Sequence, residues 1–336
     1  MSARGLIGTT ESPARLFDLA LVDLDGVAYR AHEPIEHASS SLVAARELGM
    51  ALVFVTNNAS REPEEVAAQL TSLEIPARPD EVLTAAQAAA VLLATRLAPG
   101  DKVLVVGGKG LRTATAEAGF TIVGSADEGP VAVVQGFSPD LGWRELAEAA
   151  YAVQRGAWHV ASNLDLSLPT DRGFAPGNGS LVGAVVNATG VRPDSSGKPS
   201  PAMYELAIER HGAQRPLVVG DRLDTDLAGA RAGGMPGLHV LTGVSSARDA
   251  VLARPEERPH LLGADLRALL EPHPEPQPTA EGWWRCREAA ARVVDGRLEL
   301  RGEGIDLARA ACAAAWQAAD EGAPADPSTV PEIPVA

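Results

Sequence analysis

Two carboxylates and a glycine follow a continuous apolar stretch near the N-terminus. Asp23 and Asp25 are one residue apart, and Gly26 comes directly after them. The apolar residues 19–22 predict a strand covered on both faces, since such strands show continuous rather than alternating hydrophobicity. In open α/β sheets, ligands bind where such strands end. There, one carboxylate can attack phosphorus while the other acts as acid and then base. Taken alone, the motif is equally explained by a strand that ends in a solvated Asp-Gly turn.

A hydroxyl and two side-chain amides follow the next predicted strand, residues 51–55. Thr56 can donate a hydrogen bond to a phosphoryl oxygen without adding charge, and Asn57 and Asn58 follow it. Exposed N–H groups at the start of the next helix would help to hold an anion. A helix cap without a ligand is the alternative for these residues taken alone. The β-α-β order predicts that this strand runs parallel to the first.

A lysine and two further carboxylates occur late in the chain. Lys198 precedes a predicted helix over 202–211, and a third apolar run, 216–220, ends at Asp221 with Asp226 about one helical turn later. Carboxylates without a neighbouring cysteine or histidine suit a hard cation, above all Mg²⁺.

Together and in this order, four motifs resemble the phosphatases of the haloacid dehalogenase superfamily. The motifs are Asp-x-Asp-Gly-Val at 23–27, Thr-Asn-Asn at 56–58, Gly-Lys-Pro at 197–199 and Gly-Asp-x-x-x-Thr-Asp at 220–226. The long insertion between the threonine and lysine motifs is similar to that of the subfamily with an α/β cap there, the 4-nitrophenylphosphatase, phosphoglycolate and glycerol-phosphate phosphatase group. Leu164 departs from this pattern, because relatives often have Asn-Pro-Asp where this chain has Asn163-Leu164-Asp165.

The resemblance implies a reaction through an aspartyl-phosphate. It implies three catalytic residues: the nucleophile Asp23, the general acid and base Asp25, and Lys198, which neutralises the transferring group. The phosphate-binding residues that it implies are Thr56, Asn57, Asn58 and Lys198. The implied ligands of Mg²⁺ are Asp23, Asp25 through its backbone carbonyl, and Asp221. Asp226 would contact these ligands rather than the ion, or would reach the ion through a water molecule.

The predicted fold class is α/β, with a Rossmann-like parallel-sheet core, an inserted α/β cap domain and a small C-terminal α+β module. In that module we expect a helix over 282–293, a strand over 297–300 and a helix over 305–319. The expected organisation is a flexible arm 1–15, a phosphatase core 16–80 and 193–270, a cap 81–192, a proline-rich linker 271–280, a C-terminal module 281–321 and a disordered tail 322–336.

Charge and cysteine content restrict the partners and the compartment. The chain has 29 Lys and Arg against 44 Asp and Glu, a net charge of −15 at pH 7, which disfavours nucleic acid and anionic membranes as partners. No apolar run is long enough to cross a bilayer. Two scattered cysteines do not form a disulfide framework, so a reducing cytoplasm is expected. The expected partner is a small phosphorylated metabolite, and the resemblance allows a homodimer.

The predicted function is hydrolysis of small phosphomonoesters with Mg²⁺, glycerol 3-phosphate or 2-phosphoglycolate first. One alternative is a phosphotransferase or mutase of the same fold. Another is a non-catalytic regulatory protein, which is disfavoured because every position that the chemistry needs is filled, Asp25 and Lys198 included.

Overall fold

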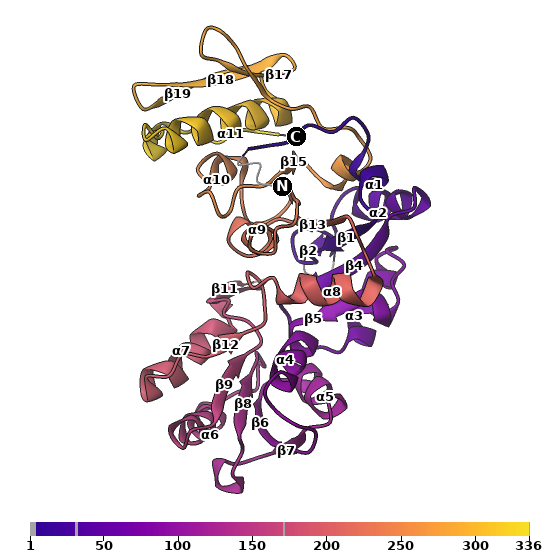
Figure 1. The fold of residues 1–336 in the computed structure, drawn as a ribbon, viewed down its shortest axis with the longest axis vertical. Coiled ribbons are helices and arrows are strands. Elements are labelled where there is room, and N and C mark those ends of the chain that lie inside the picture. The colour runs from indigo at the N-terminus through magenta and orange to yellow at the C-terminus, as the bar shows by residue number, and fades with distance from the viewer. Residues whose placement is uncertain (1–4, 31–32, 171, 336) are drawn as a thin grey trace. The chain divides into compact units, whose positions relative to one another are not determined.

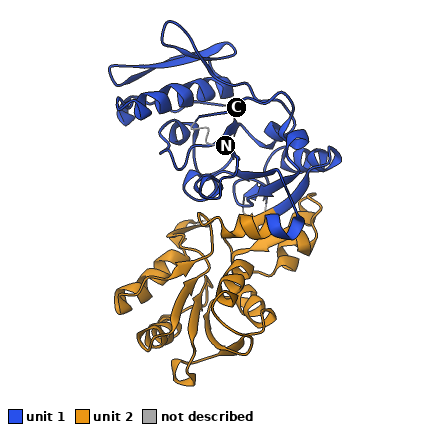
Figure 2. Ribbon diagram, in the orientation of Figure 1, with its two compact units in different colours: residues 1–53, 208–336 blue, residues 54–207 orange. Residues whose placement is uncertain are grey.

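A computed structural model describes residues 5–30, 33–170 and 172–335 of the 336-residue chain. Figure 1 shows the fold and labels its helices and strands where there is room. Figure 2 shows two compact units: unit 1 comprises residues 1–53 and 208–336, and unit 2 comprises residues 54–207. The chain therefore leaves unit 1 once and returns to it once.

Unit 1 contains β15, β14, β13, β1 and the start of β4 from a six-stranded sheet with the order β15-β14-β13-β1-β4-β5. The pairs β1 with β13, β13 with β14 and β14 with β15 are parallel. The strands are β1 (Leu19–Val22), β4 (Ala51–Thr56), β13 (Pro216–Gly220), β14 (Gly237–Val240) and β15 (Leu261–Gly263). Every residue of β1, β14 and β15 is buried, which explains the continuous apolar runs in the sequence.

Helices and turns connect these strands and place side chains at their ends. A short π-helix, η3, begins two residues after Asp221 and continues directly into α9. A two-stranded hairpin of β2 (Tyr29–Arg30) and β3 (Glu33–Pro34) follows β1. The helical elements are α1 (Pro13–Leu16), α2 (Ala38–Glu47), η3 (Leu223–Leu227), α9 (Ala228–Ala232), α10 (Ala247–Val251) and η4 (Leu266–Leu269).

The C-terminal module is a four-stranded sheet with one long helix. The sheet has the order β16-β17-β18-β19 and is antiparallel. Its elements are β16 (Gln277–Pro278), β17 (Trp284–Cys286), β18 (Ala289–Val294), β19 (Arg297–Arg301) and α11 (Gly304–Asp320). The helix predicted over 282–293 is wrong. The two-residue turn at Asp295 and Gly296, with φ of 49° and 73°, reverses the chain between β18 and β19 instead.

Helix α11 fixes the module to the rest of unit 1. Trp316 is buried and donates from Nε1 to the carbonyl of Ala250 in α10 at 3.0 Å. Arg258, 1% exposed, donates from Nη1 to both carboxylate oxygens of Asp320, at 2.8 and 2.9 Å. Removing one partner of such a pair strongly lowers the stability of the folded protein, because a buried charge is then left uncompensated.

The flexible arm and the disordered tail are also corrected, apart from residues 1–4 and 336, which lie outside the described residues. Leu6 is buried, and the N–H of Ile7 donates to the carbonyl of His260 at 2.9 Å. Val330 and Ile333 belong to the apolar cluster that contains α11. Polar composition predicted disorder, but these few apolar side chains anchor both ends.

Unit 2 contains the end of β4, which pairs in parallel with β5 (Val82–Thr84), and a separate sheet with the order β12-β9-β8-β6-β7. That sheet is parallel. Its strands are β6 (Lys102–Val106), β7 (Thr121–Val123), β8 (Ala132–Gln135), β9 (Trp158–Ala161) and β12 (Asp194–Ser195). A hairpin joins β10 (Ser167–Thr170) to β11 (Gly173–Pro176). The helical elements are α3 (Pro63–Ser72), η1 (Pro79–Glu81), α4 (Ala85–Ala94), α5 (Lys109–Glu117), η2 (Ala126–Glu128), α6 (Trp143–Gln154) and α7 (Asn178–Thr189), with α8 (Ala202–His211) leading back to unit 1.

The predicted α/β class with additional small sheets is confirmed. The boundaries of core, cap and linker remain predictions, because the two compact units follow a different division. Within the described part of the chain, no helix has both the length and the apolar character that crossing a membrane requires.

Candidate active site

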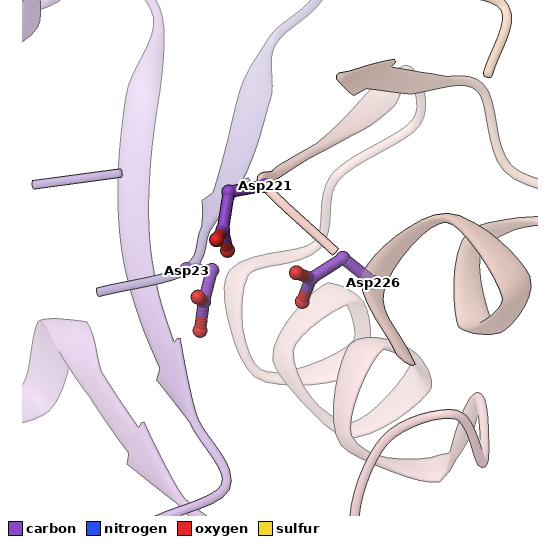
Figure 3. A group of neighbouring side chains, drawn as sticks. All are labelled: Asp23, Asp221 and Asp226. Atoms are coloured by element: carbon purple, nitrogen blue, oxygen red, sulfur yellow. The ribbon is translucent and has the colours of Figure 1, made fainter. Parts of the chain in front are cut away.

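Three carboxylates of unit 1 gather where two parallel strands end. Asp23 follows β1, Asp221 follows β13, and Asp226 lies in η3; Figure 3 shows them together. Each offers an oxygen within 4.8 Å of those of the other two. Asp23 is 9% exposed, and Asp221 and Asp226 are fully buried. We call these three residues the acidic group.

The backbone around Asp221 holds its carboxylate in one place. The N–H of Val244 donates to Asp221 Oδ2 at 2.6 Å, while Oδ1 is buried and accepts no hydrogen bond from the described residues. Gly243 and Gly26 pack against this carboxylate, since a Cβ on them would lie 1.8 and 2.4 Å from Oδ2. His239 lies 3.2 Å from the Asp221 carbonyl through Nε2, and burial lowers its pKa to about 4, so the ring is neutral at pH 7.

The acidic group fits a hard divalent cation. Buried like charges this close disfavour one another unless a cation or a proton is shared between them. Its donors are all carboxylate oxygens, with no cysteine or histidine in the group, which suits Mg²⁺. Asp226 was expected only to support the metal ligands. In the structure it offers an oxygen within 4.8 Å of those of Asp23 and Asp221, and its Oδ2 accepts from the N–H of Arg222 at 3.2 Å.

Asp25 stands apart from the acidic group. Its side chain is exposed, whereas Leu24 and Gly26 on either side of it are buried. Gly26 has a φ of 89°, a left-handed conformation that glycine adopts without strain, and its N–H donates to the Tyr29 carbonyl at 2.9 Å. The turn therefore presents Asp25 toward solvent, where a carboxyl can exchange protons with water.

Thr56 and Asn58 form a compact turn at the end of β4 in unit 2. Thr56 is 4% exposed, and its Oγ1 accepts from the N–H of Asn58 at 3.1 Å. Asn58 Oδ1 accepts from both the N–H and the hydroxyl of Ser60, at 2.8 and 2.9 Å. The Thr56 hydroxyl can still donate its own proton, whereas the Asn58 Oδ1 is engaged in the turn.

Lys198 is a buried cation beside the same strand. It is 4% exposed, and its Nζ donates to the Val55 carbonyl at 3.4 Å. Asn57 contacts its backbone from both sides: Oδ1 accepts from the Lys198 N–H at 2.9 Å, and Nδ2 donates to the Lys198 carbonyl at 3.2 Å. The predicted phosphate-binding residues Thr56, Asn57 and Lys198 thus come together within unit 2.

The structure adds two residues that the predicted site omits. Asp165 Oδ2 accepts from Asn57 Nδ2 at 3.0 Å, and Asn163 Nδ2 donates to the Asn57 carbonyl at 2.7 Å. Both lie in the Asn163-Leu164-Asp165 loop. The motif was visible in the sequence, but nothing in it indicated a partner 106 residues away.

Comparison with known proteins decides the family. The haloacid dehalogenase-like hydrolase model matches residues 20–121, and a second, HAD-hydrolase-like model matches residues 195–269. Over 317 residues the chain is 45% identical to the D-glycerol 3-phosphate phosphatase of Mycobacterium tuberculosis, with 92% of this chain and 88% of the relative covered. This chain belongs to the haloacid dehalogenase-like hydrolases.

Solved structures of phosphatases agree with this assignment. The glycerol phosphate phosphatase of M. tuberculosis in complex with magnesium superposes with a TM-score of 0.84 at 44% identity, covering 92% of this chain and 93% of that one. The 4-nitrophenylphosphatase of Thermotoga maritima gives 0.71 at 26% identity, covering 77% and 98%. The predicted resemblance to this superfamily and its 4-nitrophenylphosphatase group is confirmed.

Proposed function

We propose that this haloacid dehalogenase-like hydrolase is a Mg²⁺-dependent phosphatase of small phosphomonoesters, with glycerol 3-phosphate as the first candidate substrate. The observation that carries the proposal is the acidic group at the ends of β1 and β13. The 45% identical relative, a D-glycerol 3-phosphate phosphatase, supports this choice of substrate. Phosphoryl transfer needs positioning and charge neutralisation, which this chain supplies with few reactive groups.

In the proposed first step, a carboxylate oxygen of Asp23 attacks phosphorus and the bond to the alcohol oxygen breaks. Asp25 gives its proton to the departing alkoxide, so a neutral alcohol leaves and an aspartyl-phosphate remains. In the second step, Asp25 removes a proton from water, the resulting hydroxide attacks phosphorus, the bond between phosphorus and the Asp23 oxygen breaks, and inorganic phosphate leaves. Asp23 and Asp25 then regain their starting states, so the cycle needs no co-reactant besides water.

The remaining residues bind and neutralise. Thr56 donates its hydroxyl proton to a phosphoryl oxygen, and Lys198 balances the negative charge of the transferring group. Asp23, Asp221 and the backbone carbonyl of Asp25 would hold Mg²⁺, with Asp226 close enough to join them. When bound, the ion neutralises carboxylate and phosphoryl charge that would otherwise repel.

We also propose a cytoplasmic setting, an inserted cap domain over about residues 81–192, and a homodimer as the oligomeric state to test first. Cys286 and Cys312 are both free and buried, which supports a reducing compartment.

Phosphate release from a panel of phosphomonoesters tests the proposal. Glycerol 3-phosphate, 2-phosphoglycolate, a sugar phosphate and a nucleotide are each assayed with Mg²⁺ or EDTA, wild type beside Asp23→Asn. We expect metal-dependent release that the substitution abolishes. If folded wild type releases no phosphate from any compound, the phosphatase proposal is wrong and phosphoryl acceptors other than water become the next assay.

A further inference from the structure

Both polar atoms of the Asn57 side-chain amide form hydrogen bonds with two neighbours in unit 2. Its Oδ1 accepts from the Lys198 N–H at 2.9 Å, and its Nδ2 donates to the Lys198 carbonyl at 3.2 Å. The same Nδ2 donates to Asp165 Oδ2 at 3.0 Å. The neutral amide of Asn57 thus forms hydrogen bonds with both the N–H and the carbonyl of Lys198, and the Asp165 carboxylate fixes the orientation of that amide.

The loop that carries Asp165 is itself held from several directions. Asn163 Nδ2 donates to the Asn57 carbonyl at 2.7 Å, and its Oδ1 accepts from the Asp165 N–H at 3.2 Å. Asn178, 2% exposed, donates to the Asn163 carbonyl at 2.7 Å. The Gly179 N–H donates to the Asp165 carbonyl at 2.8 Å.

Close packing excludes larger residues from this network. A Cβ on Gly179 would lie 2.2 Å from the Leu164 carbonyl oxygen, and one on Gly197 would lie 2.9 Å from Asn57 Oδ1. The 163–165 loop and the first turn of α7 therefore build one support around residues 57 and 198.

We propose that Asn57 and Asp165 are positioning residues: Asn57 fixes the backbone of Lys198, and Asp165 fixes the amide of Asn57. We call this arrangement, Asn57 with Asp165 around Lys198, the amide bracket. The inference rests on the proposed role of Lys198 in phosphoryl transfer. In this role the Asn57 side-chain amide acts on Lys198 and Asp165, because both of its polar atoms are engaged by them.

A reciprocal exchange of the two side chains tests the bracket. Asn57→Asp keeps an oxygen for the Lys198 N–H but places a second oxygen against the Lys198 carbonyl and the Asp165 carboxylate, two acceptors. Adding Asp165→Asn supplies a donor at position 165, which restores the hydrogen bond with its direction reversed. Asn187→Asp is the matched control, because Asn187 is an exposed residue of α7 and undergoes the same chemical change.

For phosphate release from glycerol 3-phosphate, we expect Asn57→Asp to lower kcat about 100-fold with KM changed less than about threefold, because a displaced catalytic group costs rate rather than affinity. The double variant should recover at least about tenfold of that loss, and Asn187→Asp should match wild type. A double variant no better than Asn57→Asp, with weaker inhibition by inorganic phosphate in both, would instead assign Asn57 to direct phosphate binding and overturn the inference.

A thermal unfolding cycle on wild type, Asn57→Asp, the single variant Asp165→Asn and the double variant separates failure of the bracket from failure of the proposed function. Asn57→Asp should lower Tm by about 4 °C and the double variant should recover at least half of that shift. If wild type releases no phosphate, the phosphatase proposal fails while this cycle still measures the contact between residues 57 and 165. Additive Tm shifts would show that the two side chains are not coupled and would overturn the bracket whatever the activity.

Discussion

The acidic group of unit 1 and the amide bracket of unit 2 do related work with opposite chemistry. The acidic group concentrates three carboxylates within 4.8 Å and is stable as a charged group only with a cation or a proton. The bracket holds the backbone of a buried lysine with one neutral amide, that of Asn57, whose hydrogen bonds are directional. The acidic group should therefore respond to changes of charge, whereas the amide bracket should respond to which atom donates and which accepts.

The largest effect is expected in the acidic group, from Asp23→Asn. An amide has nearly the shape of a carboxylate but cannot form the phosphoryl ester, so kcat should fall by about 10³-fold or more. Release of inorganic phosphate from glycerol 3-phosphate measures it. Near-normal turnover in this variant would remove Asp23 from the nucleophile's role.

The second largest loss of activity is expected when the positive charge of Lys198 is removed. Lys198→Met keeps much of the side-chain length without the charge and should lower kcat by about 10²- to 10³-fold, a cost typical of removing one group that stabilises a transition state. Steady-state kinetics measures it, with circular dichroism confirming the fold. If kcat is unchanged and only KM rises, Lys198 contributes binding rather than transition-state stabilisation.

The variant Asp226→Asn removes one charge from the acidic group and leaves the amide bracket unchanged. Because Asp226 offers an oxygen within 4.8 Å of those of Asp23 and Asp221, the Mg²⁺ concentration for half-maximal activity should rise about 10- to 100-fold. A titration of activity with MgCl₂ measures it, and saturating Mg²⁺ should recover most of kcat. An unchanged midpoint would leave Asp226 a purely structural partner of the Arg222 N–H.

The smallest effect is a difference in acid stability between the units. Burial lowers the pKa of His239, His260 and His273 in unit 1 to about 4, against about 6.5 in an unfolded chain. The unfolded chain binds more protons between these values, so stability is complete above about pH 6.5 and falls as the pH drops toward 4. Each histidine contributes at most about 3 kcal/mol.

Unit 2 contains one histidine, His159, whose pKa burial also lowers. Hydrogen exchange followed by mass spectrometry at pH 7 and pH 5 should therefore show greater loss of protection in unit 1. Equal loss in both units would mean that the three histidines do not set the acid response.

The sequence predicted the chemistry of strand ends better than the supports behind them. Asp23, Thr56 and Asp221 were visible because each follows a continuous apolar run, and burial on both faces of a parallel sheet produces such runs. The contact between Asn57 and Asp165 spans 108 residues and depends on the orientation of one amide, which local patterns do not encode.

The wrong helix over 282–293 has a different cause. Its alanines and charged residues have helical propensity, but Asp295-Gly296 is a typical two-residue hairpin turn, and pairing with β19 overrides propensity. The tail was misjudged because composition is an average, while two buried side chains, Val330 and Ile333, suffice to anchor a segment.

The two glycines packed against Asp221 have a consequence for anyone who diversifies this gene. A library that randomises positions 26 and 243 would place a side-chain carbon 2.4 or 1.8 Å from Asp221 Oδ2, well inside van der Waals contact. In a selection for phosphate release, glycine should be the sole survivor at both sites. At exposed positions such as 187, nearly every residue should persist.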